Sequence, residues 1–182
     1  MKVTPTSFRG LYVLKPNVFS DERGSFSETY NLRTLQELGM LHTFVQVNQS
    51  FSTHGVLRGL HFQKNPYAQT KLVWPIAGSI LDVVVDLRKN EATFGKSFSI
   101  ELSEKNNLQL LVPKGFAHAF VVLSETARVL YQCDSHYHKA SEGGIRFDDP
   151  DLSIDWKLST AKFVLSEKDK NLPFLRDLDY HF

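Results

Sequence analysis

Short apolar runs separated by turn residues fill the middle of the chain, from Leu72 to Leu130. A glycine divides LVWPIAG from SILDVVVDLR, SFSIELS alternates between apolar and polar residues, and a Pro-Lys-Gly turn divides LQLLV from FAHAFVVLS. The run ARVLYQC closes the series. Short strands at regular spacing, with turn residues between them, are typical of an all-β sandwich or barrel. We therefore predict a mainly β fold.

The N-terminal part predicts further strands and one short helix. Residues Gly10–Phe19 and Ser25–Tyr30 alternate between apolar and polar positions, and Ser20–Gly24 between them is typical of a turn. An asparagine precedes Leu32–Leu38 and a glycine follows it, as at the N-cap and the end of a helix. The alternating run Phe44–Ser50 predicts another strand.

Two of these strands carry polar residues that could face a ligand. Phe26, Glu28 and Tyr30 would share one face of their strand, which is an unusual set for a core. An exposed edge face is one interpretation, and a ligand platform is the other. Gln46 and Asn48 also share a face, and these amides would bind a polar ligand only if they point into a barrel.

Composition narrows the class of protein. The chain has 182 residues, 42% of them hydrophobic, which fits a single domain spanning residues 1–182. The formal net charge of +1 gives no general reason to expect binding to nucleic acid or to an anionic membrane. The first residues lack the apolar core of a signal peptide, and no later apolar run could cross a bilayer, so we expect a cytoplasmic protein.

The cysteine content excludes two kinds of site. Cys133 is the only cysteine, so neither an intrachain disulfide nor a cysteine-rich zinc site can form. Cys133 lies in the predicted strand VLYQC, where a small buried thiol usually packs against its neighbours and is not a nucleophile.

The stretch GVLRGLHFQ carries the first candidate catalytic residue, His61. His61 follows an apolar-rich run in which Arg58 is the only charge, so it would sit on a buried strand. Lys71 comes ten residues later, and His118 lies in PKGFAHAF. These three side chains would converge if their strands belong to one barrel, although each histidine alone could equally be an ordinary structural residue.

Two parts of the chain resemble the halves of a cupin, a small double-stranded β-helix or jelly-roll barrel. Pro113 to His118 follows the P-x-G-x-x-H pattern that places a histidine inside that barrel. The first half lacks the H-x-H and glutamate of metal-binding cupins, because position 63 is Gln63. Two histidines beside an interior lysine make a poor divalent-metal site but suit an anion. We therefore predict no metal, and either metal-free acid–base chemistry or no catalysis.

A histidine, a tyrosine and an interior cation are the groups that proton abstraction next to a carbonyl requires. His61 would take the proton, Lys71 would stabilise the enolate oxygen, and Tyr131 would return a proton. Asp169 could bind His61 and hold its tautomer. Asp169 also has a structural explanation, because it follows Ser166 as in a helix capping box, and Tyr131 could be an ordinary strand aromatic.

Long motifs resemble the dTDP-4-dehydrorhamnose 3,5-epimerase family. They are DERGSFSETYN, GVLRGLHFQ, KLVWPIAGSILDVVVDLRK, PKGFAHAF and EGGIRFDDPDLSIDW, and the resemblance runs from about residue 10 to about residue 175. It implies a cupin-fold homodimer that works without a cofactor. It also implies a nucleotide-sugar substrate, dTDP-4-keto-6-deoxy-D-glucose, whose C3 and C5 are inverted through enolate intermediates to give dTDP-4-keto-L-rhamnose.

The resemblance also implies roles for individual residues. It makes His61 the base, Asp169 its partner, Tyr131 the acid and Lys71 the group that steadies the enolate oxygen. Arg23 and Arg58 would bind the diphosphate, and Phe26 and Tyr137 would bracket the thymine. Further substrate contacts are implied for Glu28, Gln46, Asn48, His118, Glu142 and Lys168.

Three alternatives stay open at this point. Relatives with the same histidine, tyrosine and aspartate include epimerases that act at C3 or C5 only, and a ketoisomerase would use similar groups. A metal-dependent cupin would need ligands that Gln63 does not supply. A non-catalytic sugar-binding cupin would have no need of the set His61, Tyr131, Asp169 and Lys71.

Overall fold

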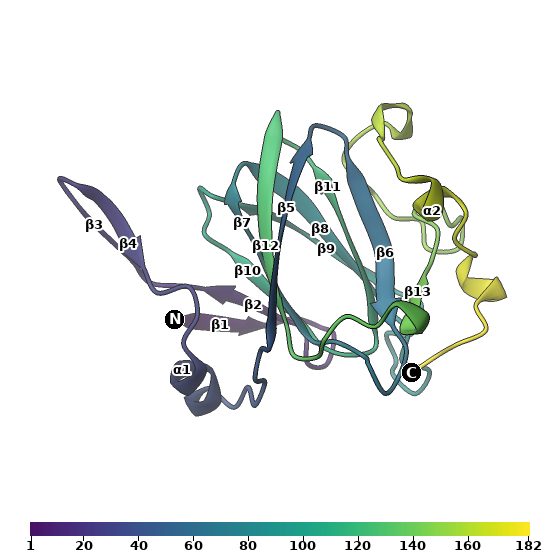
Figure 1. Ribbon diagram of the computed structural model, residues 1–182, viewed down its shortest axis with the longest axis horizontal. Helices are drawn as coiled ribbons and strands as arrows, with labels where there is room; N and C mark the ends of the chain where they lie inside the picture. The colour runs from purple at the N-terminus through teal and green to yellow at the C-terminus, as the bar shows by residue number, and fades with distance from the viewer.

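Two antiparallel sheets face each other and form most of the molecule (Figure 1). The computed structural model describes residues 1–182. The six-stranded sheet has the order β1 (Lys2–Pro5), β2 (Tyr12–Lys15), β10 (Gln109–Val112), β7 (Lys71–Ala77), β12 (Thr126–Cys133) and β5 (Gln46–Thr53). The five-stranded sheet has the order β13 (Glu142–Gly144), β6 (Leu57–Gln63), β11 (Phe116–Val122), β8 (Ser79–Asp86) and β9 (Ser97–Ser103). This architecture confirms the predicted mainly β, cupin-type jelly roll with a few short helices.

The remaining elements lie outside the two sheets. A hairpin formed by β3 (Val18–Asp21) and β4 (Gly24–Ser27) projects away from them, and we call it the arm (Figure 1). The helices are short: α1 (Leu32–Glu37), α2 (Glu167–Lys170) and the 3₁₀ turns η1 (Lys139–Ser141), η2 (Thr160–Lys162) and η3 (Leu175–Asp177). None of the helices has the length and apolar character needed to cross a membrane.

Both faces of the five-stranded sheet are covered, which explains the continuous apolar run in β8. Ile80 and Val84 pack between the two sheets, whereas Leu81 and Val83 pack under the C-terminal segment. Because side chains alternate along a strand, Asp82 shares the inward face of Ile80 and Val84. An acidic side chain therefore points into the space between the sheets.

The predicted helix caps are confirmed. The Asn31 side chain accepts a hydrogen bond from the backbone N–H of Thr34 at 3.3 Å, at the start of α1. The Ser166 hydroxyl accepts one from the N–H of Asp169 at 3.1 Å, at the start of α2. The second cap fixes the backbone that carries Asp169.

The strand predicted over Gly10–Phe19 is wrong in its extent, because the structure divides it into β2 and β3. Pro16 lies at the division, and proline has no N–H to donate to a neighbouring strand. The chain then leaves the sheet and enters the arm, so the turn predicted over Ser20–Gly24 is partly β3. The first strand, β1, was not predicted.

The strand predicted over Ser25–Tyr30 ends at the base of the arm, so its residues do not share one face. Phe26 is 69% exposed on β4. Tyr30 instead packs against Phe44, with ring centroids 5.6 Å apart. The shared face predicted for Phe26, Glu28 and Tyr30 is therefore wrong.

Candidate active site

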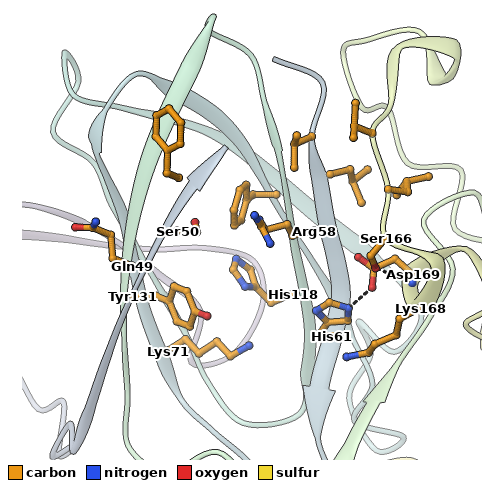
Figure 2. A pocket seen from close by; sticks show the side chains of 16 residues that line it. Gln49, Ser50, Arg58, His61, Lys71, His118, Tyr131, Ser166, Lys168 and Asp169 are labelled. Carbon is orange, nitrogen blue, oxygen red and sulfur yellow. Dashed lines mark hydrogen bonds and ion pairs between the residues drawn. The ribbon is translucent and has the colours of Figure 1, made fainter. Parts of the chain in front are cut away.

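A cavity of about 740 Å³ opens between the two sheets (Figure 2). Side chains from β5, β6, β7, β11 and β12 line it, together with the segment that begins α2. Seven of the residues predicted to act on or bind a substrate are among its lining: Arg58, His61, Lys71, His118, Tyr131, Lys168 and Asp169. The convergence expected from the sequence therefore takes place in one cavity.

A bulge in β6 brings Arg58 and His61 to the same cavity. Side chains three residues apart in a regular strand point to opposite faces. The register between β6 and β11 shifts between Arg58 and His61, so one extra residue of β6 is accommodated there. Gly59 has a φ of +127°, and a Cβ at this position would overlap Ala119. Glycine is thus required where the two strands approach.

His61 and Asp169, which both line the cavity, form a hydrogen-bonded pair. Its Nε2 lies 2.6 Å from Oδ1 of Asp169, which is only 3% exposed and also accepts from the N–H of Gly59 at 3.4 Å. Burial raises the pKa of the Asp169 carboxyl, but the hydrogen bond and charge of His61 and the N–H of Gly59 outweigh it, so the pKa lies below its ordinary value. An ionised carboxylate can only accept a hydrogen bond, so neutral His61 carries its hydrogen on Nε2 and donates it to Asp169.

The other ring nitrogen of His61 is consequently free. With Nε2 committed to Asp169, the lone pair of a neutral imidazole lies on Nδ1. Figure 2 shows this nitrogen on the side of the ring that faces Tyr131 and Lys71. His61 can therefore accept a proton from a molecule held in the cavity.

His118 belongs to a second histidine–carboxylate pair. It lies opposite His61 in the register of β6 and β11. Its Nε2 is 2.9 and 3.0 Å from the two carboxyl oxygens of Asp82, which is fully buried. Asp82 was not among the predicted site residues. Its position inside the apolar run of β8 was a usable signal, because an acid in a buried strand needs a partner.

Tyr131 and Lys71 project from the opposite sheet, on β12 and β7 (Figure 2). Burial raises the pKa of the Tyr131 hydroxyl, which keeps it protonated near neutral pH. Burial lowers the pKa of the Lys71 ammonium, and the nearby acidic groups of Cys133, Asp82 and Glu142 oppose that effect. The cavity thus has histidines on one wall and a proton donor with a cation on the other.

A smaller cavity of about 180 Å³ adjoins the first and shares His61, Lys71 and Tyr131 with it. Four predicted substrate contacts line this side cavity: Gln46, Asn48, Tyr137 and Glu142. The amide of Gln46 donates to Asn48 at 3.0 Å, which fixes both side chains. The two amides therefore do point inward, as one of the two interpretations of this strand required.

Two cations lie near the mouth of the site. The guanidinium of Arg58 donates to the Ser52 hydroxyl at 3.1 Å and forms no ion pair with a carboxylate. Lys168 forms an ion pair with Glu142 at 2.6 Å. The large cavity therefore presents Arg58 and Lys71 as unpaired positive charges, which suits an anionic ligand.

Three residues predicted to bind the substrate lie outside both cavities. Arg23 and Phe26 are on the arm, where Arg23 pairs with Asp21. Glu28 follows the arm and accepts a hydrogen bond from Asn31 at 3.0 Å. The structure of one chain does not bring them to His61.

No three His, Cys, Asp or Glu side chains gather closely enough to hold a metal ion. Each cavity histidine is instead bound to one aspartate, as described above. That the protein works without a metal stays a prediction.

Comparison with known proteins gives a consistent result. The family model described as dTDP-4-dehydrorhamnose 3,5-epimerase matches residues 5–177. A curated dTDP-4-dehydrorhamnose 3,5-epimerase from Methanothermobacter thermautotrophicus is 47% identical over 173 residues, covering 94% of this chain and 93% of the relative.

Two solved structures are similar over nearly the whole chain. The dTDP-4-dehydrorhamnose 3,5-epimerase from Elizabethkingia anophelis is 54% identical with a TM-score of 0.94, and the match covers 99% of each chain. The dTDP-6-deoxy-D-glucose-3,5-epimerase from Legionella pneumophila, solved in complex with dTDP-4-keto-L-rhamnose, is 42% identical with a TM-score of 0.93. That match covers 98% of this chain and 94% of the other.

Proposed function

Because this chain belongs to the dTDP-4-dehydrorhamnose 3,5-epimerase family, we propose that its cavity inverts C3 and C5 of dTDP-4-keto-6-deoxy-D-glucose. The product is dTDP-4-keto-L-rhamnose. Both reacting C–H bonds flank the C4 ketone of this sugar, so the ketone can accept the electrons that each deprotonation releases. The observation that carries the proposal is the placement of a base and an acid on opposite walls of one cavity (Figure 2).

His61 is the base in this proposal. Its free Nδ1 takes the proton from C5 or C3, and the resulting imidazolium is stabilised by the Asp169 carboxylate at 2.6 Å. The lowered pKa of Asp169 keeps that carboxylate ionised, so its negative charge is available to stabilise the imidazolium. Asp169 acts through His61 and has no need to touch the sugar.

Lys71 stabilises the enolate oxygen at C4. Burial of its ammonium lowers the pKa, and a negative charge that develops beside a buried cation is stabilised more than one in water. Lys71 reaches into the cavity beside Tyr131 (Figure 2). Lys71 therefore stabilises the enolate intermediate more than it stabilises the neutral ketone.

Tyr131 returns the proton from the opposite face. It is on β12 of the six-stranded sheet, whereas His61 is on β6 of the five-stranded sheet. A sugar ring between the two sheets would have one of its faces toward each residue. Removal of a proton on one face and delivery on the other inverts the carbon, which is the net reaction.

The remaining predicted contacts bind other parts of the substrate: the diphosphate, the sugar and the nucleoside. Arg58 binds the diphosphate, and His118 and Lys168 contact the sugar and its phosphate. Gln46, Asn48 and Glu142 surround the nucleoside, and Tyr137 stacks on the thymine. These assignments are consistent with the unpaired guanidinium of Arg58 and with the half-exposed ring of Tyr137.

We also propose that the protein is a homodimer in which the arm of one protomer completes the site of its partner. Phe19 and Phe26 are 64% and 69% exposed on the arm, which is unusual for aromatic side chains. The arm projects away from the two sheets (Figure 1), and none of its residues lines either cavity. Arg23, Phe26 and Glu28 can all serve as substrate contacts only if they reach another copy.

The proposal further includes a single domain over residues 1–182 and a cytoplasmic location.

Mixed dimers test the arm. One protomer carries His61→Asn with an intact arm, and the other carries Arg23→Ala and Phe26→Ala with an intact His61. Each homodimer should be nearly inactive. Co-expression should restore about a quarter of the wild-type activity, because half of the dimers are mixed and each has one complete site. If each arm instead served its own cavity, neither protomer of a mixed dimer would have a complete site. Co-expression would then restore no activity.

The function itself is tested in D₂O. The protein is incubated with dTDP-4-keto-6-deoxy-D-glucose, and deuterium at C3 and C5 is followed by NMR. Label at both carbons, with an L-configured product, supports the proposal. Label at one carbon only indicates a single-site epimerase, and no label excludes this substrate.

Elemental analysis of the active protein should find no stoichiometric metal, and finding one would indicate a metal-dependent cupin.

A further inference from the structure

Three glutamine side chains hold the backbone of four consecutive residues beside the side cavity. We call Gln46, Gln63 and Gln69 the glutamine clamp. The segment that they hold, residues 135–138, connects β12 to η1 and carries Tyr137. The bonds run from Gln69 Nε2 to Ser135 O at 2.8 Å, from Gln63 Nε2 to His136 O at 3.3 Å, from Tyr137 N to Gln46 Oε1 at 2.9 Å and from His138 N to Gln63 Oε1 at 2.6 Å.

Gln63 is the centre of the clamp. It is only 5% exposed, and its Nε2 also donates to Tyr67 O at 2.7 Å. The Nε2 of Gln63 thus donates both to the loop that carries Tyr67 and to residues 135–138, and its Oε1 accepts from the latter. A glutamate at this position would place a carboxylate oxygen, which can only accept, against two carbonyl oxygens. A carboxylate of the same shape therefore cannot replace the amide of Gln63.

The neighbouring side chain is fixed as well. The ring of His138 stacks on Tyr67 with centroids 3.8 Å apart, and its Nδ1 lies 3.0 Å from the Ser141 hydroxyl. Tyr137 contrasts with this, because the residue is 54% exposed and its hydroxyl forms a single hydrogen bond, to Glu142 at 3.4 Å. The chain therefore presents an exposed aromatic residue from a backbone that the glutamine clamp holds by four hydrogen bonds.

We infer that Gln63 is a positioning residue for substrate recognition, because it preorganises residues 135–138 so that the Tyr137 ring is already in place to stack on the nucleotide base. A loop that is ordered before binding does not have to be ordered by the ligand, so the free energy of stacking appears as affinity. This inference rests on the proposed function for the identity of the ligand. The clamp itself does not depend on that function.

The test uses Gln63→Glu, with Gln63→Leu as a second variant that removes all three hydrogen bonds. Amide hydrogen exchange should increase at Tyr137 and His138 and remain unchanged in β7 and β8. The Kd for dTDP, measured by calorimetry, should rise about tenfold. For the full substrate, KM should rise by a similar factor while kcat changes less than twofold. Gln36→Leu, at an exposed position of α1, is the matched control and should alter none of these quantities.

A double-mutant cycle with Tyr137→Ala separates positioning from general damage to the fold. If Gln63 acts through Tyr137, Gln63→Glu should weaken dTDP binding less than twofold in the Tyr137→Ala background. An undiminished tenfold loss in that background would overturn the inference, as would unchanged amide exchange at Tyr137 and His138. Should both Gln63 variants fail to fold, Gln69→Ala gives the same readouts, because this half-buried residue anchors only Ser135 O.

The outcome can be told apart from failure of the proposed function. If the wild-type protein binds no dTDP and labels no substrate, the proposed function is wrong. Faster exchange at Tyr137 and His138 in the Gln63 variants would then still establish the clamp, while the inferred role in recognition would be overturned. If the wild type is active and the clamp variants bind dTDP normally, only the inference is wrong.

Discussion

Replacing His61 with asparagine should lower kcat for epimerisation by about a thousandfold or more and should abolish deuterium incorporation at both C3 and C5. The variant loses the Nδ1 that is free to accept a proton and faces Tyr131 across the cavity, together with the contact between Nε2 and Asp169. NMR in D₂O measures both consequences in one experiment. Binding of dTDP should change little, because no nucleotide contact is removed.

His118→Asn is the matched control for this prediction. His118 and His61 are opposite each other on neighbouring strands, and each is bound through Nε2 to a buried aspartate. A base is distinguished from a binding residue by what its loss abolishes. We expect His118→Asn to weaken kcat/KM while deuterium exchange persists. If His61→Asn keeps activity within tenfold of the wild type, or if His118→Asn alone abolishes exchange, the assignment of the base is wrong.

The parts of the fold that could be predicted from the sequence are those set by local patterns. The strands between residues 72 and 130 follow from apolar runs and turn residues, and the two helix starts follow from Asn31 and Ser166. Between Gly10 and Tyr30, where the chain leaves the sheets to form the arm, the predicted strands were wrong in their extent. Alternation continues through the arm, but it has no core to face, so the pattern gave no sign of the departure.

The site required information that lies in the tertiary structure. The shared face of Arg58 and His61 depends on a bulge at Gly59, and a regular strand would have separated them. Gln63 and Gln69 bind backbone atoms of residues far along the chain, and a hydrogen bond from a side chain to a distant backbone leaves no periodic signal. Asp82 alone could have been found, since an acid within a buried apolar strand must be paired.

The arm illustrates a further limit. The resemblance to a family implied that Arg23, Phe26 and Glu28 bind the substrate, but a sequence does not state which copy of the chain a residue serves. The exposed aromatic rings on the arm and its projection away from the two sheets are the observations on which the proposed dimer rests. In the proposed dimer, the complete site would be formed by two chains.

Replacing Tyr131 with phenylalanine should separate proton exchange from inversion. The variant keeps the ring but loses the hydroxyl, whose pKa is raised by burial and which is therefore a protonated donor at neutral pH. His61 and Lys71 can still form the enolate, and His61 can return a solvent-derived deuteron to the same face. Substrate of unchanged configuration should then acquire deuterium, and formation of the L-configured product should fall by at least about a hundredfold.

The two rates are measured together by NMR in D₂O, with the L-configured product trapped by a reductase. Tyr12→Phe, in β2 and outside the lining of both cavities, removes a hydroxyl from the same sheet and should leave both rates unchanged. Inversion at the wild-type rate in Tyr131→Phe would mean that another donor serves the second face. Loss of exchange together with inversion would mean that Tyr131 is needed to form the enolate, and its role as the acid of the second face would be wrong.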